Sequence, residues 1–259
     1  MGKLYLVRHG QASFGAADYD TLSDIGRRQS LRLGEYWRSK GQTFDAVLVG
    51  TLKRQTQTLD GILEGMTGGS AAHAVASVGA QFPDGPPRGK FAPSGGSAAH
   101  AVASVGATLI QWPGLNEYDS AAVIAAIHPE PLQKPDTPEL YRHHFRLLRD
   151  GLTQWMNGVV SPKGMPSYVD FQKGVTSALD YVRANHDGDV LLVSSGGPIS
   201  TAVGHVLGTS PETTIEMNLR IRNASITEFA FTPKRHMLVT YNTLPHLDHA
   251  DHASWITYA

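Results

Sequence analysis

"LYLVRHGQAS", residues 4–13, joins a short apolar run directly to an arginine, a histidine and a glycine. A continuous apolar run that stops at a glycine is typical of a buried β-strand. Side chains that follow such a strand lie at the carboxyl edge of the sheet, where open α/β sheets bind their ligands. We therefore expect Arg8 and His9 to face a ligand.

The rest of the chain alternates between strand and helix patterns. Apolar runs recur at 46–49, 108–110 and 189–193. Helical patterns separate them: 169–183 carries its apolar residues at helical spacing, a helix begins near Ser23 or Asp24, and 134–157 is a further helical region. The late segments "ASITEFAF" and "HMLVTYN" indicate a hairpin at a sheet edge. These patterns predict an α/β fold in three layers, a mostly parallel central sheet flanked by helices.

Composition limits the possible functions. The chain has 259 residues, of which 41% are hydrophobic and 17% charged, with a net charge of −1. We expect one globular domain over residues 1–259, with no nucleic-acid or membrane partner. The chain has no cysteine, which excludes thiol catalysis, disulfides and thiolate metal sites. The N-terminal apolar run is too short for a signal peptide or a membrane span, which predicts a cytoplasmic protein.

One segment is duplicated. "GGSAAHAVASVGA" occurs at 68–80 and again at 95–107, with a Pro- and Gly-rich spacer between the copies. Two copies do not make a solenoid, and their small residues offer little apolar area for a core. We interpret residues 66–107 as an inserted, flexible duplication in which His73 and His100 are copied bystanders.

Several polar residues follow the expected strands and open the expected helices. Arg54 lies in "TLKRQTQT" after the second strand, Glu117 follows "WPGLN", and "SSGGP" follows the strand that ends at Val193. A parallel sheet would gather these positions with Arg8 and His9 along one edge. Two guanidinium groups suit the oxygens of a phosphoryl group, and a neutral histidine between them suits attack on phosphorus.

The motifs "LVRHGQA", "YDTLSDIGRRQSLRLG", "FDAVLVGTLKRQTQT", "LNE", "VLLVSSGGPI" and "NASITEF" together resemble the histidine phosphatase superfamily, in its phosphoglycerate mutase-like branch. The resemblance implies that His9 takes the phosphoryl group, Arg8 and Arg54 hold its oxygens, and Glu117 donates a proton. It also implies a site without metal or cofactor and a small phosphorylated substrate, although a phosphoprotein is not excluded.

The substrate itself is not readable from the sequence. We place Gln11, Ser13, Phe14 and Gly196 against it, beneath a helical cap region of residues 118–165. The oligomeric state is left open.

The chain departs from the family at one position. The resemblance implies a second histidine in an "HGG" turn, and this sequence has Ser195 in "SSGG". A hydroxyl supplies one neutral donor where an imidazolium would supply a charged one, so we expect a slowed enzyme. Two cases are possible. If the turn has room for the ring, replacing Ser195 with histidine would raise turnover; if the pocket is rebuilt around serine, the ring would crowd the phosphate.

Three functions remain open: a phosphomonoester hydrolase, a phosphoglycerate mutase-type transferase and a non-catalytic binder of phosphorylated ligands.

"HLDHADH", residues 246–252, has donors for a zinc or nickel ion. No helical pattern surrounds it, and we interpret it as a solvated tail segment.

The duplication generates the first prediction. Deleting residues 68–94 removes one copy with its spacer and leaves the same sequence after Thr67. We expect melting temperature and activity to remain nearly unchanged, because long insertions contribute little to the core. Thermal melting checks this, and a fall of more than a few degrees would contradict the insertion hypothesis.

Overall fold

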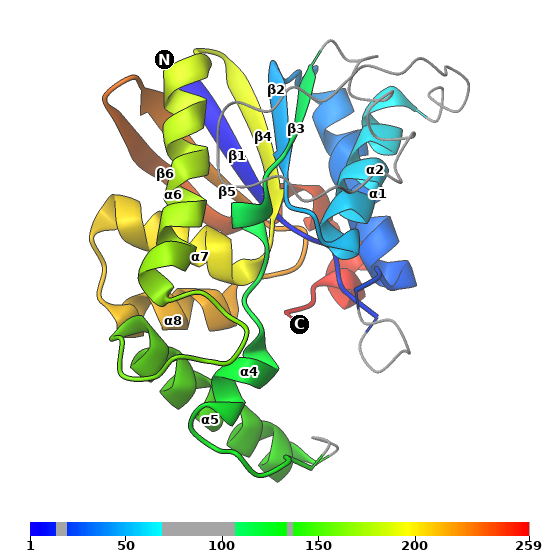
Figure 1. Cartoon of the computed structure of the whole chain (residues 1–259). Coiled ribbons are helices and arrows are strands. Elements are labelled where there is room, and N and C mark those ends of the chain that lie inside the picture. The colour runs from blue at the N-terminus through cyan, green and yellow to red at the C-terminus, as the bar shows by residue number, and fades with distance from the viewer. Residues whose placement is uncertain (14–19, 69–106, 134–136, 259) are drawn as a thin grey trace, which may run out of the picture.

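The computed structural model describes residues 1–13, 20–68, 107–133 and 137–258. Its centre is a six-stranded sheet in the order β3-β2-β4-β1-β5-β6 (Figure 1). The strands are β1 (Gly2–Arg8), β2 (Ala46–Val49), β3 (Thr108–Gln111), β4 (Asp189–Ser194), β5 (Ile226–Thr232) and β6 (Arg235–Thr243). The first four strands are mutually parallel, whereas β5 is antiparallel to both of its neighbours. The predicted mostly parallel sheet with an edge hairpin is confirmed.

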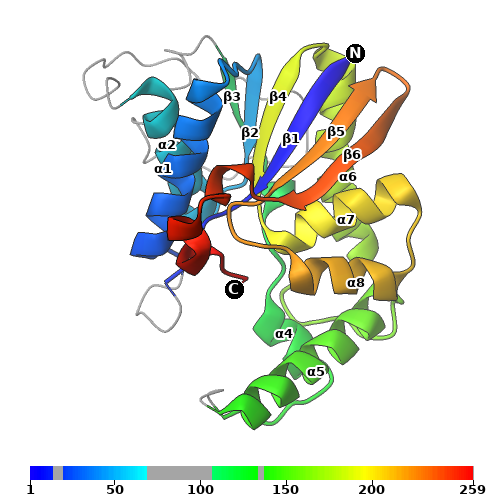
Figure 2. The ribbon, with the colours of Figure 1, turned by 180° about the vertical axis from the view of Figure 1, so that it is seen from behind.

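Helices cover both faces of the sheet, which confirms the three predicted layers (Figures 1 and 2). On one face, α1 (Asp24–Ser39) and α2 (Lys53–Thr67) pack over Val7, Val47 and Val193. On the other, α6 (Tyr168–Asn185) and α7 (Gly196–Leu207) pack over Leu6 and its neighbours. Successive strand residues point to opposite faces, so a continuous apolar strand supplies both cores.

The remaining helices lie toward the carboxyl edge of the sheet. These are α4 (Ser120–Ala125), α5 (Pro138–Met156) and α8 (Pro211–Arg220), with a 3₁₀ turn η2 (Pro113–Leu115) after β3. Figures 1 and 2 show α4 and α5 projecting beyond the ends of the strands. Side-chain caps start several helices, and the predicted Ser23 accepts from the Gly26 amide at 3.1 Å.

Close backbone contact fixes the loop after β1 against α1. A Cβ on Gly10 would lie 2.5 Å from the Gly26 carbonyl oxygen, and one on Gly26 would lie 2.2 Å from the Gln11 carbonyl oxygen. Neither position has room for a side chain. The glycine of "RHG" therefore lets α1 approach the loop that carries the histidine.

The duplicated segment lies outside the described residues except at its ends. Met66 and Thr67 lie within the predicted insertion, but they form the last turn of α2, and Gly68 ends that helix in the left-handed conformation. Ala107 precedes β3 and packs on the α1/α2 core. The sequence-based boundary was therefore wrong at the start, because the apolar pattern of α2 extends through Met66.

The C-terminal segment is packed against the body of the protein, and our interpretation of it as a solvated tail is wrong. It forms the 3₁₀ helices η3 (Pro245–Leu247) and η4 (Ala250–Trp255), of which η3 contacts α1. His246 is completely buried, whereas His249 and Asp251 remain exposed. No described helix has both the length and the apolar character needed to cross a membrane.

Burial of His246 predicts a loss of stability in acid. Burial, then the Arg32 and His252 charges, lowers the pKa of His246 from 6.5 to about 3. Between these values the unfolded chain binds a proton that the folded protein excludes, so folding stability falls as pH decreases. We expect His246→Leu to reduce this slope by about 1.4 kcal/mol per pH unit. Urea unfolding from pH 4 to 6.5 measures it, with exposed His249→Gln as the control; equal slopes in wild type and His246→Leu would contradict the expectation.

Candidate active site

His9 follows β1 and is held as a neutral imidazole. The residue is 5% exposed, and its Nδ1 lies 2.7 Å from the Gly10 carbonyl oxygen. Arg54 Nε donates to His9 Nε2 at 3.2 Å, which assigns the imidazole proton to Nδ1. Burial, followed by the Arg8 and Arg54 charges, holds the pKa of His9 well below its usual range. Nε2 therefore keeps a lone pair at neutral pH, as a nucleophile requires.

Arg54 lies in the first turn of α2 and is oriented by Asp20. Arg54 Nη1 forms an ion pair with Asp20 Oδ1 at 2.7 Å, and its side chain is only 11% exposed. Asp20 Oδ2 also accepts from the Lys53 amide at 2.9 Å, at the N-terminus of α2. One carboxylate thus fixes both the helix start and the guanidinium beside His9. Our sequence reasoning missed Asp20, although it lies in the quoted "YDTLSDIGRRQSLRLG" motif.

Arg8 ends β1 one residue before His9 and therefore points toward the opposite face of the sheet. Its Nη1 donates to the backbone carbonyls of Ile221 and Tyr258. Gly196 lies close by, because a Cβ built on it would be 3.6 Å from Arg8 Nε and 2.8 Å from Asn218 Oδ1. The glycine turn after β4 and the first arginine thus meet, as predicted for the sheet edge.

Glu117 reaches the same edge from the loop after η2. Both of its carboxylate oxygens are 3.1 Å from the Gly197 amide, which donates to them, and the Tyr118 amide donates to Oε1 at 3.3 Å. Burial raises the pKa of Glu117, while these amides, Arg54 and Arg8 act in the opposite direction. A Cβ on Gly197 would lie 2.2 Å from Glu117 Oε1, so the turn needs glycine there. The result is a partly buried carboxyl group that retains its proton more readily than an exposed one.

Ser195 is fully buried, and its hydroxyl is engaged by a residue that our sequence reasoning missed. Gln55 Nε2 donates to Ser195 Oγ at 2.8 Å and to the Leu115 carbonyl at 2.9 Å. Gln55 is itself completely buried beside Arg54. The space beside Ser195 is therefore filled by a carboxamide, and an imidazole ring at this position would have to displace it.

The expected substrate contacts lie partly elsewhere. Gln11 and Ser13 line an open hollow together with Arg27 of α1, and the lining includes neither His9 nor Glu117. The Gln11 carboxamide oxygen accepts from Ser23 Oγ at 2.8 Å. Phe14 lies outside the described residues.

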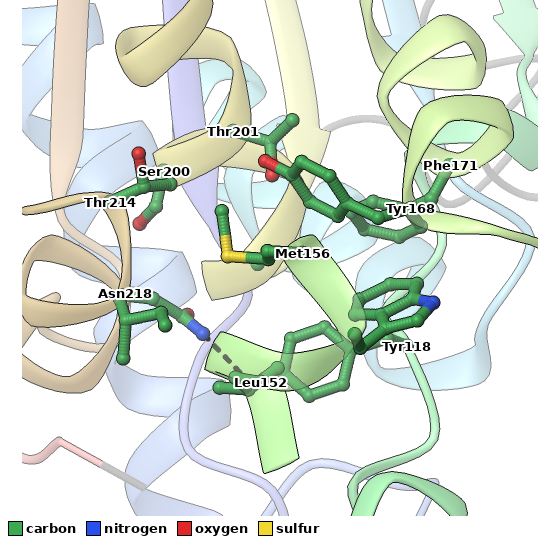
Figure 3. Close-up of a pocket in the computed structure, with 12 residues that line it drawn as sticks. Tyr118, Leu152, Met156, Tyr168, Phe171, Ser200, Thr201, Thr214 and Asn218 are labelled. Carbon is green, nitrogen blue, oxygen red and sulfur yellow. Dashed lines mark hydrogen bonds between the residues drawn. The ribbon is translucent and has the colours of Figure 1, made fainter. Parts of the chain in front are cut away.

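A small cavity adjoins Glu117 beneath the helices of the cap region. Figure 3 shows its walls, which come from α5, α6, α7 and α8 together with Tyr118. Its volume of about 20 Å³ has room for one water molecule. Tyr118 closes one side, where its hydroxyl accepts from Asn218 at 2.8 Å, and Gly197 lines the cavity as well as binding Glu117. The aromatic contacts of Tyr118 with Trp155 and Phe171 join this wall to α5 and α6.

The C-terminal segment lies against Arg8. Gln29 of α1 donates to the Trp255 carbonyl and to Thr257 Oγ1, while the Asn223 amide donates to the Thr257 carbonyl. These contacts lead to Tyr258, whose carbonyl meets Arg8. Across the described parts of the chain, no cluster of three or more His, Cys, Asp or Glu side chains is placed to hold a metal ion.

Comparison with known families identifies the chain. Residues 4–72 and 97–244 match the model of the histidine phosphatase superfamily (branch 1). This protein belongs to the histidine phosphatase superfamily. The match includes Arg8, His9, Arg54, Glu117 and Ser195, and it omits residues 73–96, inside the duplicated region.

Solved structures share the fold at low sequence identity. Phosphoserine phosphatase from Entamoeba histolytica, in complex with 3-phosphoglyceric acid, superposes with a TM-score of 0.59 at 17% identity, covering 95% of this chain and 100% of that one. A mycobacterial glucosyl-3-phosphoglycerate phosphatase superposes with a TM-score of 0.56 at 18% identity, covering 94% of this chain and 100% of that one. Phosphoglycerate mutase from Bacillus anthracis superposes with a TM-score of 0.56 at 16% identity, covering 95% of this chain and 94% of that one. The α/β fold of this superfamily member is thus that of phosphoglycerate mutase-like proteins.

The raised pKa of Glu117 generates a prediction on stability. A carboxyl group whose pKa is higher in the folded protein than in the unfolded chain stabilises the fold at low pH. This contribution to folding stability is lost as pH rises from the unfolded-state pKa through the folded-state pKa. Replacing it with glutamine removes this loss, so we expect Glu117→Gln to gain stability relative to wild type at pH 7 more than at pH 4. Urea unfolding at both pH values measures the difference. Glu64→Gln on the exposed side of α2 is the control, and an equal effect of Glu117→Gln at both pH values would contradict the prediction.

Proposed function

We propose that this protein is a phosphomonoester hydrolase that works through a phosphohistidine on His9. The observation that carries the proposal is the pairing of His9 Nε2 with Arg54 Nε at 3.2 Å inside a buried site. His9 Nε2 presents a lone pair next to a fixed guanidinium, and Glu117 supplies a carboxyl group whose pKa is raised by burial. A nucleophile without its proton and an acid with its proton are the two groups that phosphoryl transfer needs.

In the first step, His9 Nε2 attacks phosphorus in line with the leaving oxygen. The new P–N bond forms as the P–O bond breaks, and Glu117 gives its proton to the leaving oxygen. The imidazole ring gains positive character, which the Gly10 carbonyl stabilises by accepting from Nδ1–H. Arg8 and Arg54 neutralise the phosphoryl oxygens.

In the second step, water attacks the phosphohistidine. Glu117, now a carboxylate, takes a proton from the water as the P–N bond breaks, and inorganic phosphate leaves. His9 returns to the neutral form, and Glu117 has its proton again. Ser195 supplies one neutral hydroxyl donor, so we propose a slower transfer than a second imidazolium would support.

We propose a small phosphorylated molecule as the substrate. The fold neighbours include proteins named for phosphoserine, glucosyl-3-phosphoglycerate and phosphoglycerate, which supports this class without choosing among its members. The cap region of residues 118–165, including Tyr118 and α5, is our proposal for the part that contacts the leaving group.

Trapping the intermediate tests the proposal. Wild type mixed with a ³²P-labelled phosphomonoester that carries a second, free hydroxyl group and quenched in alkaline detergent should carry label that acid removes, as expected of phosphohistidine. His9→Ala should carry no label and release no phosphate, because no neighbouring group can replace the nucleophile. His249→Ala, an exposed position at the start of η4, serves as the histidine control.

The outcomes separate the alternatives. Release of inorganic phosphate at the rate of substrate loss supports hydrolysis, whereas label that moves to a second position of the substrate would indicate mutase chemistry. Unlabelled wild-type protein that binds vanadate but releases no phosphate would indicate a non-catalytic binder and would overturn the proposal.

A further inference from the structure

His9 and Ser195 are neighbours across the centre of the sheet. β1 and β4 run parallel with Arg8 opposite Ser194, and the His9 amide donates to the Ser194 carbonyl at 2.8 Å. Side chains alternate along a strand, and Val7 and Val193 both point toward α1 and α2. Two residues further on, His9 and Ser195 leave the two strands toward the same side, where α2 begins.

Consecutive residues of α2 hold these two side chains. Arg54 donates to His9 Nε2 at 3.2 Å, and Gln55 donates to Ser195 Oγ at 2.8 Å. Both the Gln55 and the Ser195 side chains are fully buried. A single helical turn therefore contacts the proposed nucleophile and the serine beside it.

The direction of the Gln55–Ser195 hydrogen bond is fixed by the other partners of the carboxamide. Gln55 Oε1 accepts from the Leu52 amide at 3.3 Å, and Nε2 donates to the Leu115 carbonyl at 2.9 Å. A backbone amide can only donate and a carbonyl can only accept, so exchanging the oxygen and nitrogen of Gln55 would lose both bonds. The carboxamide also packs against the bare Cα of Gly50, where a Cβ would lie 2.0 Å from Oε1.

The Ser195 hydroxyl must consequently donate its own proton to a group other than Gln55. Its oxygen accepts from Gln55, which leaves the O–H as a donor. None of the residues that the structure describes accepts this proton from Ser195 in a hydrogen bond. A phosphoryl group on His9 Nε2 would bring acceptor oxygens to this side of the sheet edge.

We propose that Gln55 is a positioning residue that orients the Ser195 hydroxyl as an obligate donor to the transferring phosphoryl group. The inference rests on the proposed function, and it assigns a role to a residue that does not itself touch the substrate. Gln55 supplies no charge and moves no proton. It prevents Ser195 from donating to the protein and so keeps the donor directed at the substrate throughout the reaction.

Reversing the hydrogen bond tests the proposal. Gln55→Glu has nearly the same shape, but its carboxylate accepts the Ser195 proton and withdraws it from the phosphoryl group. We expect kcat/KM for p-nitrophenyl phosphate to fall roughly tenfold to a hundredfold, the range for loss of one hydrogen bond to a charged group. The kcat/KM of Ser195→Ala should fall by a similar factor. In the Ser195→Ala background, Gln55→Glu should have less than about a threefold further effect, because the two changes remove the same interaction.

Vanadate inhibition separates an oriented donor from a merely structural role. Vanadate adopts the five-coordinate geometry of the phosphoryl group in transfer, so its inhibition constant should rise by the same factor as kcat/KM falls across the variants. Gln57→Glu, two residues along α2, is the matched control: Gln57 accepts from the Leu22 amide through its oxygen, which a carboxylate retains. If Gln55→Glu does not fold, Gln55→Met in the same cycle removes the donor without adding a charge.

The outcomes distinguish this inference from the function on which it rests. Additive losses from Gln55→Glu and Ser195→Ala, or vanadate inhibition unchanged by either, would overturn the role of Gln55 while leaving the hydrolase proposal intact. Wild-type protein that forms no phosphohistidine would overturn the proposed function, and the role of Gln55 with it.

Discussion

Parallel pairing of β1 with β4 is the constraint on which the site depends. It sets Arg8 opposite Ser194, so the residues that follow each strand leave the sheet side by side. Strand alternation then sends Arg8 to the face of α7 and α8, where it meets the Ile221 carbonyl, and His9 to the face of α2. A shift of register by one residue would reverse these directions and separate the histidine from Arg54. The apolar residues of both strands hold that register, because each face is buried under helices.

Burial acts in opposite directions on the two titratable groups of the site. A low-dielectric surrounding disfavours charge, which lowers the pKa of His9 and raises that of Glu117. The same physical cause therefore favours the neutral form of both the imidazole and the carboxyl group. The largely buried guanidinium of Arg54 has a partner of opposite charge, because Asp20 pairs with it at 2.7 Å.

The sequence was informative where function depends on strand ends and uninformative where it depends on distant contacts. His9, Arg54 and Glu117 were predictable because each follows a recognisable strand or opens a helix. Gln55 was not, since its partner Ser195 is 140 residues away and a glutamine beside an arginine has no signature of its own. The interpretation of the segment around His246 was wrong for a related reason: the lack of a helical pattern indicated a solvated tail, but η3 contacts α1 and the His246 imidazole is buried.

The contact between Arg8 and the Tyr258 carbonyl has a practical consequence for handling the protein. The last described residues lie against the side chain of Arg8, for which we propose a role in binding phosphate, and Gln29 and Asn223 hold them there. A bulky label attached at Tyr258 would disturb the orientation of Arg8. The first residue of β1, Gly2, lies at the opposite end of that strand from Arg8 (Figure 1). Labels, surface tethers and purification handles therefore belong beside the start of β1 and not beside Tyr258.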